Sequence, residues 1–379
     1  MNITVVMGFF LPMPPAAGGA TEKSWHELAL ELARRGHEVI VISREWSGWP
    51  DRETRDGVKY IRLRGHDHTP RLAMNLWIDF WWSLRVWRAL PPANITVVNC
   101  LALPVWLGWL RGSAGRLVVM PGRMPKGQYR FYRRLDRVLA VSSTVRDAVL
   151  AENPRLAGIT RILGYPIRWH ELSRARSELS ASGPLTIGYI GRIHREKGLD
   201  LLVAALSQLV KIPGLPAWRV ILCGPSSVEQ GGSGADYARQ LEQSLATALP
   251  AKTFEIRPAE FAPDRLAALY GSLDVFCYPS LATQGETFGV AVVEAMAAGA
   301  VPVVSDLPCF GDFIRDGENG DVFDHTAPDA AARLCAALTQ LLIDPARRTR
   351  LAAAARTDAR QYDFPVFADR LLEDFSTLK

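Results

Sequence analysis

Apolar residues in this chain gather in short runs that alternate with longer segments of helical periodicity. In the first half, strand-like runs occur at residues 2–8, 38–43, 58–63, 95–99, 116–120 and 138–142. Helical periodicity is clearest between them at 21–35 and 71–90. Strands that alternate with helices in this way predict a doubly wound α/β sheet.

The same alternation begins again after residue 184. Residues 163–184 are polar, Ser-rich and contain proline, which makes them the best candidate for a linker. Strand patterns then follow at 185–191, 219–223, 253–256, 274–278 and 301–306, and the chain ends in helical segments at 327–342, 345–360 and 364–378. We therefore expect two Rossmann-like domains, 1–168 and 180–362, that face each other across a cleft.

Composition excludes several classes of protein. A length of 379 residues suits two domains, and a net charge of +5 gives no reason to expect a nucleic-acid partner. The longest apolar runs fall short of the roughly 20 residues that cross a membrane. Residues 1–10 are typical of a first strand and lack the features of a signal peptide. Five scattered cysteines without a C-x-x-C pair predict buried, reduced thiols in a cytoplasmic protein: Cys100, Cys223, Cys277, Cys309 and Cys335.

Residues 285–299 carry the clearest candidate site. They join the strand at 274–278 to the strand at 301–306 through a Gly-containing loop and an apolar helix, which we expect from near Phe288 to Gly299. Strand–helix–strand units bind ligands at the carboxyl ends of the strands, where Glu286 lies. The unpaired amides of the first helical turn favour an anion there.

Glu294 interrupts the apolar run of this helix. A buried carboxylate is costly without a partner, so two interpretations remain. Glu294 could line one elongated cleft with Glu286, about 12 Å away along a helix, or it could pair with a neighbouring arginine for structural reasons alone.

Two further stretches have the character of phosphate sites. Arg192 and Lys197 lie where the strand at 185–191 gives way to a helix, a cationic clamp suited to a diphosphate, although such residues often form a solvated face. Gly18 and Gly19 end the loop after the first strand, where glycine lets the backbone approach a ligand, although a simple turn is the commoner use.

These motifs together resemble the retaining GT-B glycosyltransferases of family 4. The resemblance rests on Gly191 and Arg192 through Lys197 and Gly198, followed by Glu286 and Glu294 with seven residues between them. It is strongest over residues 185–325 and weakest over 45–180. Three shorter stretches are similar to other parts of the family: 18–19, 36–39 and 316–320.

The resemblance implies a role for each side chain. Arg192 and Lys197 would hold the donor diphosphate and stabilise the leaving nucleotide, as preorganised charges do. Glu286 would bind hydroxyls of the donor sugar, and Glu294 the ribose. These four residues would supply the charged part of the donor site.

The backbone contacts implied by the resemblance come from both domains. Amides of Phe288, Gly289 and Val290 would touch sugar and phosphate, and Gly19 would touch the diphosphate. The helix at 363–379 would cross back to the first domain. The activity implied is metal-independent transfer of a hexose-type sugar, with retention, from a UDP- or GDP-linked donor to a glycan, lipid-linked sugar or glycoconjugate precursor. No D-x-D metal motif occurs in a strand–loop context, and no cofactor is expected.

Two features depart from the family pattern. Residues 118–123 lack the histidine that often follows the fifth strand of the first domain, and this affects how the donor sugar is positioned. Arg123 is a candidate for that polar role. Residues 164–167 lack the usual Asn-Gly-Val-Asp of the linker, which concerns only the hinge.

Two other functions compete with glycosyl transfer. A nucleotide-sugar epimerase would need further acid and base residues in the cleft. A non-catalytic sugar-nucleotide-binding subunit would be expected to have lost Glu286, Arg192 or Lys197, and all three are present.

Residues 111–137 indicate a membrane partner. They hold eight basic residues and one acid, interleaved with Met124, Tyr129, Phe131 and Tyr132, a mixture suited to an anionic lipid surface or a lipid-linked acceptor. A solvated face and an acidic soluble acceptor are the alternatives. Trp77 and Trp81 share one helical face upstream, which is more typical of a core. The protein would then be cytoplasmic and peripheral at the inner face of the membrane.

Overall fold

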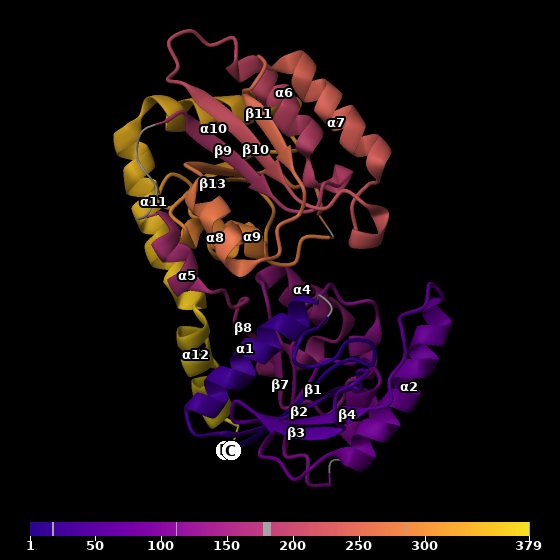
Figure 1. The fold of residues 1–379 in the computed structure, drawn as a ribbon. Helices are drawn as coiled ribbons and strands as arrows, with labels where there is room; N and C mark the ends of the chain where they lie inside the picture. The colour runs from indigo at the N-terminus through magenta and orange to yellow at the C-terminus, as the bar shows by residue number, and fades with distance from the viewer. Residues whose placement is uncertain (17–18, 111, 177–182, 284, 379) are drawn as a thin grey trace. The chain divides into compact units, whose positions relative to one another are not determined.

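The structure is a computed structural model that describes residues 1–379 apart from 17–18, 111, 177–182, 284 and 379. It divides into two compact units (Figure 1). Unit 1 comprises Met1–Pro166 and Phe364–Lys379, and unit 2 comprises Ile167–Asp363. Each unit contains one sheet with helices packed against it.

The sheet of unit 1 has eight strands in the order β3-β4-β2-β1-β5-β6-β7-β8. All neighbours are parallel except β3 and β4. The central strands are almost wholly apolar and buried because helices cover both faces of the sheet. The strands are β1 (Asn2–Val6), β2 (Glu38–Arg44), β3 (Arg52–Arg55), β4 (Val58–Leu63), β5 (Ile95–Val98), β6 (Arg116–Val119), β7 (Arg137–Ala140) and β8 (Thr160–Ile162).

The helices of unit 1 include one from the far end of the chain. Helix α12 (Phe364–Ser376) packs on α1 (Ala20–Arg34), as expected for the returning C-terminal helix. Two ion pairs fix it: Arg35 Nε to Asp369 Oδ1 at 2.9 Å and Arg137 Nε to Asp374 Oδ2 at 2.9 Å. The other helical elements are α2 (Leu72–Ala89), α3 (Leu103–Leu107), α4 (Ser143–Glu152), η1 (Gln128–Phe131) and η2 (Pro154–Ile159).

The sheet of unit 2 has six parallel strands in the order β11-β10-β9-β12-β13-β14. The strands are β9 (Leu185–Ile190), β10 (Trp218–Cys223), β11 (Phe254–Arg257), β12 (Val275–Tyr278), β13 (Val301–Ser305) and β14 (Asp321–Phe323). The helices are α5 (Trp169–Ala175), α6 (Leu199–Leu209), α7 (Ala235–Ala248), α8 (Pro263–Gly271), α9 (Val290–Ala297), α10 (Ala330–Ile343) and α11 (Pro345–Ala359), with single turns η4 (Arg195–Lys197), η5 (Val228–Gln230), η6 (Phe310–Asp312) and η7 (Arg360–Tyr362). The two sheets confirm the predicted α/β class.

The stretch expected to be a linker contains helix α5, so the second unit begins at Ile167 rather than at residue 180. Helix α5 is only seven residues long, and tertiary contacts hold it. Trp169 donates its backbone N–H to Asp363 Oδ1 at 3.2 Å and its indole N–H to the Arg356 carbonyl at 3.0 Å. A helix this short shows too little apolar periodicity to be recognised from the sequence.

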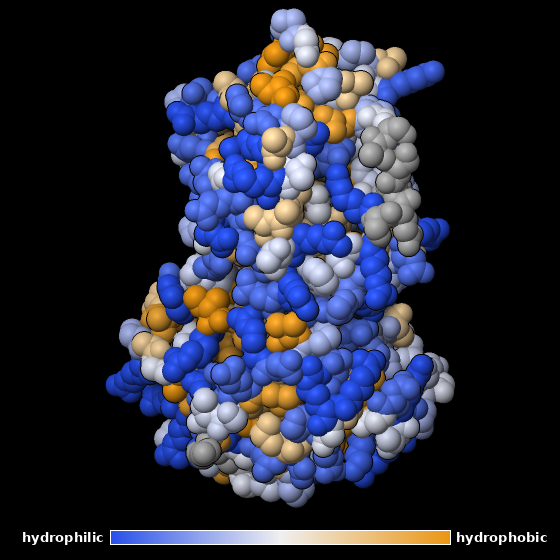
Figure 2. Space-filling view, turned by 90° about the vertical axis from the view of Figure 1, so that its left-hand side faces the viewer, coloured by the Kyte–Doolittle hydropathy of each residue, from blue (hydrophilic) through white to orange (hydrophobic). Residues whose placement is uncertain are grey.

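Figure 2 shows one face of the molecule, where hydrophilic residues predominate and hydrophobic ones form separate groups. All five cysteines are buried free thiols, as expected. Within the described part of the chain, no helix is both long and apolar enough to cross a bilayer.

Candidate functional site

The loop after β9 places the expected cationic clamp. Gly198 has φ +67°, and a Cβ atom there would lie 1.9 Å from the Pro279 carbonyl oxygen. Only glycine therefore allows the turn η4 to lie against the loop that follows β12. This close approach brings Lys197, the last residue of η4, to the residues that follow the neighbouring strand.

Lys197 and Glu286 form a buried ion pair. Lys197 Nζ lies 2.6 Å from Glu286 Oε2, and the two side chains are 5% and 10% exposed. The Ser280 hydroxyl donates to the same oxygen at 3.1 Å. Lys197 Nζ also lies 5.3 Å from the centre of the Tyr278 ring, within the range of a cation–π contact. The sequence assigned the lysine and the glutamate to different parts of a donor, and the structure puts them in direct contact.

Hydrogen bonds fix the guanidinium group of Arg192, although its side chain remains 41% exposed. It donates from Nη2 to Glu196 Oε1 at 2.7 Å and from Nη1 to the Gly231 carbonyl at 2.8 Å. The Tyr189 hydroxyl donates to the Arg192 carbonyl at 2.7 Å, which fixes the backbone. Arg192 is therefore oriented, and part of its charge faces solvent.

Helix α9 begins at Val290, two residues later than expected, with Gly289 as its N-cap at φ +90°. A Cβ atom at Gly289 would lie 2.6 Å from the Phe310 ring, so glycine is required. Phe288 is buried and packs on Phe313 and Tyr362, with ring centroids 5.1 and 5.3 Å away. Its side chain belongs to the core, and only its backbone remains for the predicted donor contact.

The end of α9 matches the prediction. Gly299 has φ +84° and donates to the Met296 carbonyl at 3.0 Å, and Ala300 donates to Ala295 at 3.0 Å. These two bonds form a Schellman motif, the usual left-handed helix end.

Glu294 lies on α9, half-buried, and accepts a hydrogen bond from the Tyr270 hydroxyl at 2.8 Å. Burial raises the pKa of Tyr270 well above its usual value, and the charge of Glu294 adds to the effect. Tyr270 therefore stays a neutral donor that orients the carboxylate. The sequence suggested an arginine as the alternative partner of Glu294, and Tyr270 gave no signal in the pattern of α8.

Gly19 is the N-cap of α1 in unit 1, with φ +81°. Its neighbour Gly18 lies outside the described residues. A Cβ atom at Gly19 would lie 2.1 Å from Glu22 Oε2, so the glycine makes room for this carboxylate. Glu22 is 6% exposed and was not singled out from the sequence. Burial raises the pKa of Glu22, while its own backbone amide and the charge of Arg123 oppose that shift.

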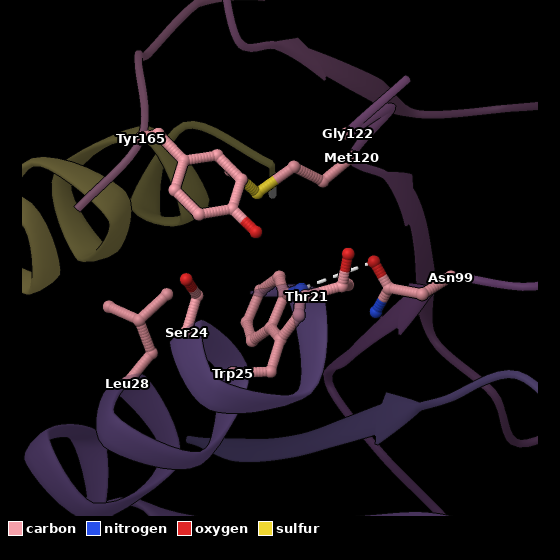
Figure 3. Close-up of a pocket in the computed structure, with 8 residues that line it drawn as sticks. All are labelled: Thr21, Ser24, Trp25, Leu28, Asn99, Met120, Gly122 and Tyr165. Carbon is pink, nitrogen blue, oxygen red and sulfur yellow. Dashed lines mark hydrogen bonds between the residues drawn. The ribbon is translucent and has the colours of Figure 1, made fainter. Parts of the chain in front are cut away.

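Figure 3 shows the residues beside this helix start. The Trp25 indole donates to Asn99 Oδ1 at 3.1 Å, and the Tyr165 hydroxyl points toward Thr21 and Ser24. The space that they enclose is only about 10 Å³, close to the least that holds one water molecule. It is a packing gap rather than a ligand pocket. The other lining residues are Leu28, Met120 and Gly122.

The described residues contain no group of three or more His, Cys, Asp or Glu side chains that could hold a metal ion. That the activity needs no metal ion stays a prediction, because a metal ion can also be bound through the phosphates of a substrate. His66 and His68, which flank Asp67, belong to no such group.

Sequence comparison places the chain among known proteins. Residues 173–358 match the family "Glycosyl transferases group 1", and residues 17–155 match "Glycosyltransferase Family 4". A D-inositol 3-phosphate glycosyltransferase of Rhodococcus erythropolis is 32% identical over 53% of this chain and 43% of the relative. A phosphatidyl-myo-inositol mannosyltransferase of Mycobacterium tuberculosis is 40% identical over 30% of this chain and 29% of the relative. These two alignments span less than half the length of either relative.

A third relative matches over the whole chain. A GDP-mannose-dependent alpha-mannosyltransferase of Mycobacterium tuberculosis is 26% identical over 100% of this chain and 97% of its own.

Solved structures show the fold. A sucrose-phosphate synthase from Thermosynechococcus elongatus superposes with a TM-score of 0.74 and 22% identity, over 100% of this chain and 98% of its own. A trehalose-6-phosphate protein from E. coli bound with UDP-2-fluoro glucose gives 0.76 and 14%, over 99% of each chain. Since these two family models together match most of the chain and the solved structures show a GT-B fold, the chain belongs to the GT-B glycosyltransferases of family 4, the glycosyl transferases group 1.

Proposed function

We propose that the protein transfers a hexose-type sugar, with retention of configuration, from a nucleotide-diphosphate sugar to a hydroxyl acceptor. The observation that carries this proposal is the buried Lys197–Glu286 pair beside the oriented Arg192, at the carboxyl ends of β9 and β12. Ligands of open α/β sheets bind at this edge. The pair places the Lys197 ammonium group, which can bind a phosphate, next to the Glu286 carboxylate, which can accept hydrogen bonds from sugar hydroxyls.

In this mechanism Arg192 and Lys197 balance the charge that grows on the diphosphate as its bond to the sugar breaks. Lys197 has three N–H donors, so it could keep Glu286 while it binds a phosphate oxygen. The leaving phosphate oxygen takes the proton of the acceptor hydroxyl, and the new bond forms on the face that the phosphate leaves. The amides of Gly289 and Val290 would add donors to the same region.

Glu294 would bind the ribose of the donor. Its carboxylate is oriented by Tyr270 and can accept from two hydroxyls. In this proposal the donor is a sugar linked to UDP or GDP. The whole-length relative named for GDP-mannose makes that donor the first to test.

Unit 1 would bind the acceptor, and Gly19 would contact the donor diphosphate. The acceptor class that we propose is a glycan, lipid-linked sugar or glycoconjugate precursor. Two relatives are named for phosphorylated inositols, so inositol phosphates are sensible acceptors to include in a test. The Glu22 carboxylate lies against Gly19, and the charge of Arg123 acts on Glu22, so both groups would face such an acceptor.

The test is release of nucleotide from a panel of UDP-, GDP- and ADP-linked hexoses, with and without acceptor, followed by NMR of the anomeric proton in the product. Transfer with retention is the expected result. A changed sugar still attached to the nucleotide would indicate an epimerase. Binding without nucleotide release from any donor would indicate a non-catalytic subunit, and either result would refute the proposal.

We also propose that residues 111–137 contact an anionic membrane surface or a lipid-linked acceptor. Arg130, Arg133 and Phe131 are exposed and support this. Other members of the segment have roles within the fold: Tyr129 and Tyr132 are buried, Arg137 pairs with Asp374 and Arg116 pairs with Asp136. Arg111 lies outside the described residues.

Charge reversal tests this contact. Arg130→Glu with Arg133→Glu should abolish co-sedimentation with anionic vesicles at low salt, and binding of the wild type should fade as salt screens the charges. Arg155→Glu, at an exposed arginine of η2, is the control. Absence of wild-type binding at low salt would favour a soluble acceptor.

A further inference from the structure

Helix α2 turns most of its aromatic side chains outward. The sequence favoured a core position for Trp77 and Trp81, and the structure contradicts this, since Trp77 is 60% exposed and Trp81 and Phe80 are exposed beside it. The three rings contact one another: the ring centroid of Trp81 lies 6.0 Å from that of Trp77 and 5.8 Å from that of Phe80. These three aromatic rings of the helix therefore lie on the surface.

The inward side of α2 is unusually polar. Asp79 accepts from the Ala102 amide at 2.6 Å, and Ser83 accepts from the Trp106 indole at 3.1 Å. Trp82 is buried and donates to the Met7 carbonyl at 3.1 Å. These directed bonds fix which face of α2 points inward, so the outward aromatic face is a feature of the fold and not of a loosely packed helix.

The apolar surface continues beyond α2. Trp87 donates to the Leu110 carbonyl at 3.2 Å and packs edge-on against Trp106 of α3. Trp109 is 55% exposed, and the Arg134 guanidinium lies 3.7 Å from the centre of its ring. We name the whole surface the aromatic face; its exposed members are Leu72, Leu76, Trp77, Phe80, Trp81, Trp87, Trp109 and Leu110.

The chain segment that carries the aromatic face is strongly basic. Between residues 71 and 135 the only acid is Asp79, which is buried. The same segment holds ten basic residues: Arg71, Arg85, Arg88, Arg111, Arg116, Arg123, Lys126, Arg130, Arg133 and Arg134. Exposed aromatic and aliphatic side chains on a basic segment, with Arg134 stacked on Trp109, suit the headgroup region of an anionic bilayer.

We propose that the aromatic face inserts into the interface of an anionic membrane, with α2 lying in the plane of the bilayer. This inference rests on the proposed membrane contact of residues 111–137 and adds the apolar half of that contact. Tryptophan suits the position because its ring is apolar and its N–H can reach water or headgroups. A second copy of the chain is a poor occupant, because two basic faces would repel each other.

The test uses flotation with vesicles of phosphatidylcholine alone or with phosphatidylglycerol, and tryptophan quenching by lipids brominated along the acyl chain. The variant is Trp77→Ser with Trp81→Ser. The control is Phe261→Ser, which removes a comparably exposed aromatic ring (63%) from unit 2. We expect quenching of the wild type by anionic brominated vesicles, at least about a tenfold loss of vesicle partitioning in the double variant, and none in the control.

Circular dichroism and nucleotide release from the donor in solution should be unchanged in the double variant, which separates membrane docking from folding and from glycosyl transfer. Vesicle binding that needs Arg130 and Arg133 but survives loss of both tryptophans would leave the electrostatic contact standing and overturn insertion. Insertion is also overturned if wild-type fluorescence is not quenched. A concentration-dependent dimer that the double variant loses would instead make the aromatic face a protein interface.

Discussion

Replacing Lys197 by methionine would leave Glu286 as a buried carboxylate without its counter-charge, hydrogen-bonded to the hydroxyls of Ser280 and Tyr278. The two charges are 2.6 Å apart, and their side chains are 5% and 10% exposed. With an effective dielectric constant of about 20, their attraction is about 6 kcal/mol, much of which offsets the cost of burying both charges. Removal of one partner of a buried pair typically costs 3–5 kcal/mol because the other charge is left without compensation. We expect Lys197→Met to lower the free energy of unfolding by about that amount.

A double-mutant cycle isolates the pair. Glu286→Gln alone should also destabilise, because it leaves the ammonium group buried without a counter-charge. The double variant, Lys197→Met with Glu286→Gln, should lose less than the sum of the single variants, with a coupling energy of about 2 kcal/mol or more. Catalysis does not enter this measurement, so it tests the structure separately from the proposed function.

Urea denaturation at pH 7.5, followed by far-UV circular dichroism and by tryptophan fluorescence, gives the four free energies. A matched control is the Arg239–Asp236 pair on α7, whose side chains are 67% and 94% exposed. The corresponding cycle there should give less than about 0.5 kcal/mol, as exposed pairs do. A coupling for Lys197 and Glu286 as small as that of the control would refute the reasoning that burial gives this pair its strength.

Four other outcomes are expected. Arg192→Ala should lower kcat/KM for transfer about 100-fold without a change in Tm, because its pair with Glu196 is partly exposed; equal activity of variant and wild type would contradict its role. Glu294→Ala should weaken nucleotide binding in calorimetry, and Tyr270→Phe should do so to a smaller degree, since Tyr270 only orients the carboxylate. Activity should survive a chelator, and rescue by magnesium after its loss would show that a metal is required. Asp79→Asn should stabilise the protein at pH 7.5 by up to about 3 kcal/mol and have little effect near pH 4, because burial raises the pKa of Asp79 from 3.8 to about 6. The native carboxyl binds more protons than the unfolded one in that window, so wild-type stability falls as the pH rises through it, and a constant difference in Tm from pH 4 to 7.5 would contradict the pKa.

Local signals in the sequence predicted local structure well. Gly299 follows an apolar run and precedes a strand, and these two features are sufficient to predict a left-handed helix end. The strand Val58–Leu63 has the bounds that its pattern indicated. The short strands β3, β8 and β14, of three or four residues, were missed because so few residues show no period.

Contacts between distant residues were harder to predict. Glu286 and Lys197 are separated by 89 positions, and only the folded sheet, with Gly198 against Pro279, brings them together. Helical spacing showed that Trp77 and Trp81 share a face of α2 but could not show whether that face points inward. The hydrogen bond from Ala102 to Asp79 decides it, and this bond comes from a loop that the periodicity of α2 does not report.

Helix α12 has a consequence for how the protein is made. Unit 1 needs residues 364–376 to pair Arg35 with Asp369 and Arg137 with Asp374. On the ribosome, the first 166 residues emerge long before these partners are synthesised. The Arg137 side chain, 7% exposed in the finished fold, therefore has no Asp374 carboxylate to pair with at that stage. Unit 2 is continuous in sequence and can form in the meantime. The order of synthesis therefore differs from the order of completion: the unit that begins the chain is the last to close.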